Sequence, residues 1–133
     1  MISKEEYETL RAKIIEELKE EKRAKDRARV ELNEAAYGMF DETTREYMPK
    51  LMNEFYDELR KGYPTGSDSF IACRCKDMVD AAKRTAIELL CEKNAVTVYK
   101  NGRVEEANKL LADLLEDKIR RHREQGNGNA KQQ

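Results

Sequence analysis

Four acidic residues recur at a regular spacing in the middle of the chain. Glu54 and Asp57 are three residues apart, and Asp77 and Asp80 repeat that interval. Carboxylates that bind a metal in a helical bundle must point into the bundle. On a helix wheel, however, Asp57, Asp77 and Asp80 lie roughly 140° or more from the apolar stripe of their own helix. Their spacing therefore predicts a solvated, ion-paired face.

The same four residues resemble the E-x-x-E and E-x-x-D pattern of the all-α nucleotide pyrophosphohydrolases of the MazG type. That resemblance implies a Mg²⁺-dependent hydrolase in which the acidic pairs hold the metal ion against a triphosphate. Asp57 and Asp77 stand where the family has Glu. Because the wheel positions oppose this function, it is the third hypothesis for the chain, and we predict that the protein is not an enzyme.

The three cysteines are the next candidates for chemistry. Cys73 and Cys75 point roughly 200° apart on a helix, so both cannot ligate one ion. Cys75 lies on the predicted core stripe. Cys73 and Cys91 share the outer face but lie about 27 Å apart along the axis, too far for a disulfide. With Ile87 close to the same face, they predict a smaller stripe that contacts the first helix or another subunit.

His122, the only histidine, lies in a basic last helical turn, where it complements the helix dipole. No Ser or Cys can be placed beside it from the sequence. We predict no catalytic residue, no cofactor and no metal site.

Composition favours exposed helices. Of the 133 residues, 40% are charged and 7% aromatic, which argues against an all-β domain. The 26 basic and 27 acidic residues nearly cancel, so no global charge attracts nucleic acid or a membrane. The odd cysteine count, the charged N-terminus and the lack of a long apolar run predict a reduced, cytoplasmic protein that does not enter membranes.

The fold that this pattern predicts is an all-α bundle of about four helices. The first helix spans residues 3–40, begins with a capping box at Ser3 and Glu6, and is interrupted by a charged middle; a break near Asp26 is the alternative. Its apolar stripe contains Tyr7, Leu10, Ile14, Leu18, Ala28, Leu32, Ala35 and Met39. We predict one domain over residues 1–125, from which the helix at 3–40 partly extends.

Three further helices are expected. The second starts after an N-cap at Asp41, kinks or restarts around Met48 because Pro49 lacks an amide, and ends at Gly62. The third runs from Ser67 or Asp68 to about residue 93, and the fourth from residue 104 to about 124. Residues 126–133 have the composition of a disordered tail.

The segment 95–104, AVTVYKNGRV, remains open to two interpretations. Alternating apolar residues before Asn101 and Gly102 indicate a short β-hairpin, such as the wing of a DNA-binding domain. The second strand would be short, however, since the fourth helix begins nearby. The alternative is an extended link over 94–100 followed by a helix capped at Asn101.

Basic residues gather near the end of the chain. Four of six residues there are basic, and the hairpin tip adds two more, which makes a nucleic-acid-associated regulator or packaging-type factor the second hypothesis. Its candidate contacts are Lys100, Arg103, Lys118, Arg120, Arg121 and Arg123.

The leading hypothesis is a small protein that binds another protein or itself through helical surfaces, as a homodimer for example. The long first helix needs a surface to pack against, and no catalytic constellation competes with this interpretation. The candidate interface residues are Tyr7, Leu10, Ile14, Leu18, Cys73, Ile87 and Cys91.

Overall fold

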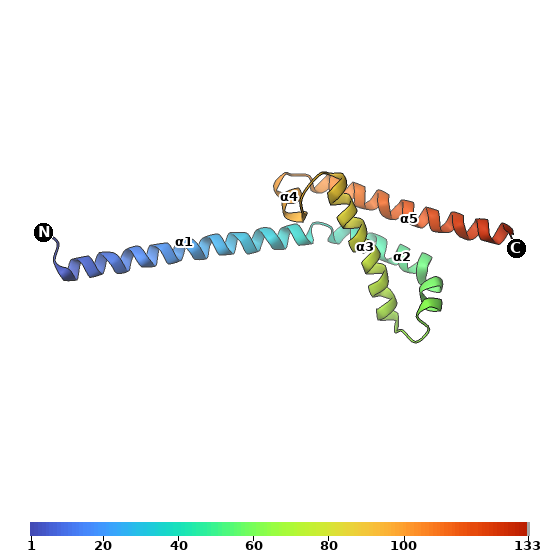
Figure 1. The fold of residues 1–133 in the computed structure, drawn as a ribbon, viewed down its shortest axis with the longest axis horizontal. Helices are drawn as coiled ribbons and strands as arrows, with labels where there is room; N and C mark the ends of the chain where they lie inside the picture. The colour runs from blue at the N-terminus through green and yellow to red at the C-terminus, as the bar shows by residue number, and fades with distance from the viewer. Residues whose placement is uncertain (133) are drawn as a thin grey trace. The chain divides into compact units, whose positions relative to one another are not determined.

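The computed structural model describes the backbone of residues 1–132 and the side chains of residues 1–126. Over these residues the chain forms five α-helices and no strand, which confirms the all-α prediction (Figure 1). It divides into two compact units, Met1–Ala35 and Ala36–Gln133. No helix of the described part is long and apolar enough to cross a membrane.

The first unit is a single helix, α1 (Lys4–Gly38), whose last residues belong to the second unit. Ser3 Oγ accepts a hydrogen bond of 3.1 Å from the Glu6 amide, which is one of the two bonds of the predicted capping box and caps the helix start. The helix is unbroken at Asp26, so the alternative of two helices is wrong. All side chains of residues 1–31 are exposed.

The second unit holds the core. It consists of α2 (Asp41–Gly62), α3 (Asp68–Leu89), the short α4 (Ala95–Lys100) and α5 (Val104–Gln132). Apolar stripes at helical spacing on α2, α3 and α5 meet in one cluster. The buried members of that cluster are Phe40, Tyr47, Leu51, Phe55, Cys75, Val79, Leu90, Val98, Ala107, Leu111, Leu115 and Ile119.

Two predictions for α2 are wrong. Phe40, not Asp41, is the N-cap, and it makes no side-chain cap bond; Asp41 is the first helical residue. Of the kink or restart expected around Met48, the restart is also wrong, because one helix continues through Pro49. Tyr47 and Leu51 on either side of Pro49 are both buried in the core cluster, so tertiary packing maintains the helix where the missing amide would favour a break.

The C-terminus of α3 lies earlier than predicted. Ser67 caps its start, as expected, by accepting a bond of 3.2 Å from the Phe70 amide. At its end the Cys91 amide bonds to the Glu88 carbonyl and the Glu92 amide to the Ile87 carbonyl, which is a Schellman motif. Cys91 takes the left-handed position, with φ of 58°, that glycine usually occupies.

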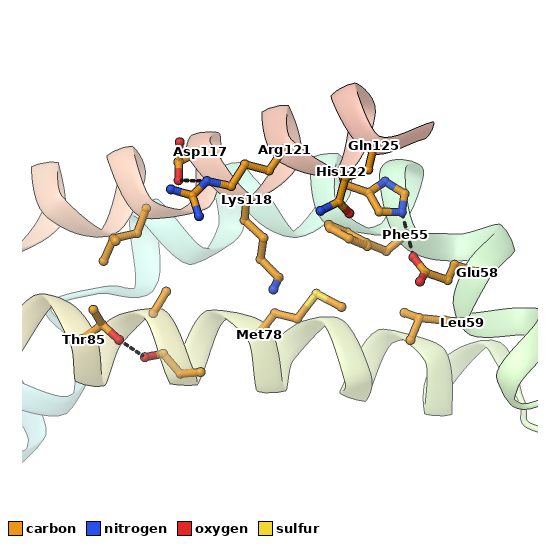
Figure 2. Close-up of a pocket in the computed structure, with 13 residues that line it drawn as sticks. Phe55, Glu58, Leu59, Met78, Thr85, Asp117, Lys118, Arg121, His122 and Gln125 are labelled. Atoms are coloured by element: carbon orange, nitrogen blue, oxygen red, sulfur yellow. Dashed lines mark hydrogen bonds and ion pairs between the residues drawn. The ribbon is translucent and has the colours of Figure 1, made fainter. Parts of the chain in front are cut away.

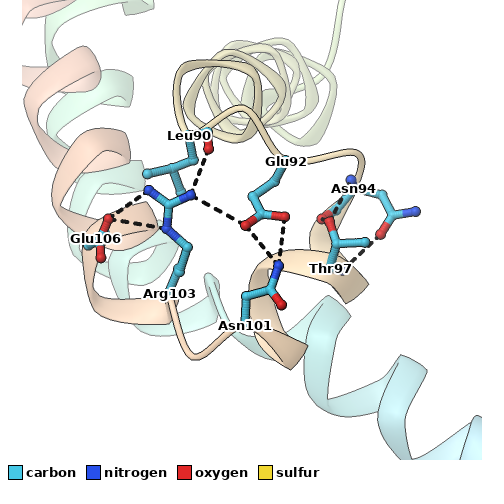
Figure 3. A network of polar contacts seen from close by, with 7 residues as sticks. All are labelled: Leu90, Glu92, Asn94, Thr97, Asn101, Arg103 and Glu106. Carbon is cyan, nitrogen blue, oxygen red and sulfur yellow. Dashed lines mark hydrogen bonds and ion pairs between the residues drawn. The ribbon is translucent and has the colours of Figure 1, made fainter.

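Neither interpretation of residues 95–104 is correct, because this segment forms α4. Asn94 and Thr97 make a complete capping box at its start (Figure 3). Asn101 is the C-cap of α4 and does not begin the next helix, while Gly102, with φ of 68°, makes the turn into α5. Val98 is fully buried in the core cluster, which explains why the segment folds as a helical turn and not as a free hairpin.

The last helix starts at Val104 as predicted but extends past residue 124, to Gln132. Residue 133 and the side chains of residues 127–132 lie outside the described part of the structure. The backbone over residues 126–132 continues α5, so the disordered tail predicted for residues 126–133 is not seen there.

Candidate functional site

Four large apolar side chains form a line along the exposed surface of α1. Tyr7, Leu10, Ile14 and Leu18, which we call the α1 stripe, are separated by three, four and four residues. At 100° per residue they fall within about 80° of the helix circumference and span about 16 Å along its axis. Their exposed fractions are 61%, 48%, 54% and 58%. The predicted interface residues of this helix therefore lie together on one accessible face.

The two edges of the α1 stripe carry opposite charge. Over residues 4–22, the charged side chains that lie about 60° to 80° from the stripe's centre are basic on one edge and acidic on the other. The basic edge consists of Lys4, Arg11 and Lys22, and the acidic edge of Glu6 and Glu17, whereas Glu21 and Lys25 lie on the line of the stripe itself. All five edge residues are exposed.

The four carboxylates at the spacing discussed for a Mg²⁺ site, those of Glu54, Asp57, Asp77 and Asp80, do not converge on one point. Glu54 contacts His122 and Arg123, at 2.9 and 3.0 Å. Asp77 pairs with Arg74, and Asp80 with Lys76 and Lys83. Asp57 is exposed. Among the described residues, no cluster of three or more His, Cys, Asp or Glu side chains could hold a metal ion.

His122 occupies a different environment from the one that the sequence suggested. Its Nδ1 lies 2.9 Å from Glu54 Oε1 and its Nε2 lies 2.7 Å from Glu58 Oε2, so α5 is tied to α2; Figure 2 shows the contact with Glu58. Its ring also packs on Phe55, with 4.4 Å between centroids. The hydrogen bond to Glu54 raises the pKa of His122, and the hydrogen bond to Glu58 adds to this rise. Partial burial of the imidazole lowers the pKa but does not cancel the effect of the two carboxylates. The hydrogen bond to His122 in turn lowers the pKa of Glu54.

A groove of about 610 Å³ is lined by residues of α2, α3 and α5, Glu58 and His122 among them (Figure 2). The small side chains Ala81 and Ala82 of α3 form part of its wall. Lys118 Nζ lies 5.8 Å from the centre of the Phe55 ring, and Arg121 pairs with Asp117 at 2.8 Å. The groove thus has apolar walls and a rim of mixed charge.

The basic candidates for nucleic-acid contact are largely paired within the chain. Arg103 donates to the Leu90 carbonyl at 2.7 Å and forms ion pairs with Glu92 and Glu106 (Figure 3). This network joins the end of α3 to the start of α5, so Arg103 has a structural role. Lys100 is exposed.

The C-terminal cluster shows the same pattern. Arg120 and Arg121 both pair with Asp117, and Arg123 pairs with Glu54. The positive charge of this cluster is therefore balanced by carboxylates close to it, which reduces the local potential that a phosphate backbone would meet.

The cysteine face predicted on α3 is not a continuous stripe. Cys73 is exposed on the helix, whereas Cys91 lies in the turn after it and Ile87 packs partly against the core. Cys75 is fully buried, as expected, and burial raises the pKa of its thiol. These residues do not form one accessible apolar surface comparable with the α1 stripe.

Sequence reasoning missed the cluster of Glu54, Glu58 and His122. The two carboxylates are one helical turn apart on α2, which is a usable signal, but nothing in the sequence places the end of α5 beside that turn. The chain matches no protein-family model, no curated protein and no solved structure.

Proposed function

We propose that this chain is a non-enzymatic assembly protein that binds another α-helix through the α1 stripe. The observation that carries the proposal is the row of four large apolar side chains, each about half exposed, in a unit whose side chains are all exposed up to residue 31. Contiguous exposed apolar surface on a helix is characteristic of interaction sites.

Helix energetics support the same function. Helical stability in proteins comes mainly from packing an amphipathic face, not from intrinsic propensity. The ion pairs inside α1, such as that of Arg29 with Asp26, are exposed and contribute little. Complete burial of a large apolar side chain contributes roughly 1.5–3 kcal/mol. A partner helix that buries the α1 stripe would therefore stabilise α1 far more than its own exposed ion pairs do.

The nucleic-acid hypothesis draws less support from the geometry. Its strongest sequence feature, the basic end of α5, consists largely of arginines that pair with Asp117 and Glu54. A protein-binding role uses the exposed surface as it stands, whereas phosphate binding would compete with these ion pairs.

Capture from a cell extract, followed by identification of the retained proteins, tests the proposal. The bait is the full chain, compared with Ile14→Glu on the stripe and with Val30→Glu, which places the same charge at a half-exposed apolar residue on another face. We expect an identified protein, the chain itself included, to be retained by wild type and Val30→Glu and lost with Ile14→Glu. Equal retention by both variants would contradict the proposal.

A further inference from the structure

We propose that the partner of the α1 stripe is the same stripe on a second copy of the chain, with the two helices parallel and in register. This inference rests on the proposed function and names its partner. Apolar faces set the contact in a two-helix assembly, while the charges at the edges choose partner and orientation. The α1 stripe has both components.

In a parallel pair, the acidic edge of one helix lies against the basic edge of the other. A side chain at one edge then meets the side chain five residues later on the partner helix, as g and e positions do in coiled coils. This offset joins Glu6 to Arg11 of the second copy and Glu17 to Lys22 of the second copy. The two-fold axis repeats each pair, so four ion pairs flank the apolar contact.

An antiparallel pair would bring like charges together. Its basic edges would face each other, and so would its acidic edges. With the stripe centres aligned, Arg11 would lie near Arg11 of the second copy, and Glu6 near Glu17 of the second copy. Like charges across such an interface are unfavourable, so the charge pattern selects the parallel arrangement.

The four side chains are available for this pairing. Within the described residues, none of Glu6, Arg11, Glu17 and Lys22 forms an ion pair in its own chain. The ion pairs of this unit use Arg23 and Arg29 instead, with acidic partners on the same helix. Binding to an unspecified apolar helix would need only the apolar side chains of the stripe. The opposite charges on its two edges therefore favour a partner with the same edges, which is a second copy of the chain.

Disulfide trapping in the full chain tests the orientation. The exposed Cys73 and Cys91 are first replaced by Ser, and then a single cysteine is introduced as Tyr7→Cys or as Leu18→Cys. The parallel arrangement predicts that each variant oxidises to a covalent homodimer, because each position faces itself across the axis. Thr9→Cys, on the opposite face of α1, is the control and should remain largely monomeric.

The two failures give different results. A disulfide that forms only when Tyr7→Cys and Leu18→Cys are mixed would overturn the parallel orientation and leave self-association intact. Absence of any stripe disulfide, with a monomeric chain in light scattering, would overturn self-association; stripe-dependent capture of a different identified protein would then still support the proposed function.

Charge exchange provides a second readout. Arg11→Glu should weaken the dimer by about tenfold, because it turns two attractive pairs into repulsive ones. Adding Glu6→Arg to the same chain should restore the dissociation constant, whereas Lys19→Glu, away from both edges, should leave it unchanged. No rescue by the double variant would argue against the proposed pairing.

Discussion

Glu54 and His122 lie 68 residues apart in the chain and approach to 2.9 Å, which fixes the C-terminal half of α5 against α2. The Glu54 side chain is only 14% exposed, and its other oxygen accepts a hydrogen bond from Arg123. A protonated imidazole donates from both ring nitrogens, to Glu54 and to Glu58. This contact is a structural ion pair of the second unit and lies outside the α1 stripe.

Stability should therefore depend on pH on both sides of neutrality. The pKa of His122 is raised in the folded state. The contribution of His122 to the free energy of unfolding is therefore complete below its pKa in the unfolded chain, about 6.5, and is lost as the pH rises through its pKa in the folded protein. The pKa of Glu54 is lowered, so its contribution is present above the unfolded value and lost as the pH falls through the folded one.

Chemical denaturation of the full chain across this pH range measures the effect. We expect the free energy of unfolding to fall as the pH rises from about 6 to 9, and His122→Gln to reduce that fall. An unchanged slope in His122→Gln would show that the contact does not contribute.

The turn after α3 offers a stabilising substitution. Cys91 holds φ of 58° without the freedom of glycine, so Cys91→Gly should raise the free energy of unfolding by about 1 kcal/mol. Cys73→Gly is the matched control: Cys73 is exposed on α3, where glycine should destabilise by roughly 0.3 kcal/mol, because cysteine is itself a poor helix former. Thermal melts of the two variants should shift in opposite directions, and a shift in the same direction would contradict the assigned Schellman motif.

Truncation of Lys100 and of Arg103, which flank the turn at Asn101 and Gly102, should change the stability of the fold by different amounts. Arg103 donates to the Leu90 carbonyl and pairs with Glu92 and Glu106, so Arg103→Ala should lower the free energy of unfolding clearly more than Lys100→Ala does. Lys100 is exposed, and Lys100→Ala should change stability by less than about 0.5 kcal/mol. Denaturant titration measures both changes. Similar small effects for the two variants would show that the Arg103 network does not hold the helices together.

Periodicity predicted most of the second unit because its helices bury one face each. Leu51, Val79 and Leu111 belong to runs of apolar residues at helical spacing, and each of them is fully buried. Leu89, the last residue of α3, is 58% exposed, whereas its neighbour Leu90 belongs to the buried core.

The errors occurred where tertiary contacts override local preference. Residues 95–100 have a strand-like composition, yet the capping box at Asn94 and burial of Val98 make them a helix. The His122 contact depends on how α5 packs on α2, which helical spacing does not reveal. The α1 stripe was predicted correctly as a set of residues on one face, since its members depend only on the pitch of one helix.

Sedimentation equilibrium of the full chain tests the central claim, which is self-association through the α1 stripe. We predict a reversible monomer–dimer equilibrium for wild type and for Val30→Glu, and a monomer at the same concentrations for Leu10→Glu. A wild-type chain that stays monomeric throughout, or a dimer that Leu10→Glu leaves unchanged, would contradict the account.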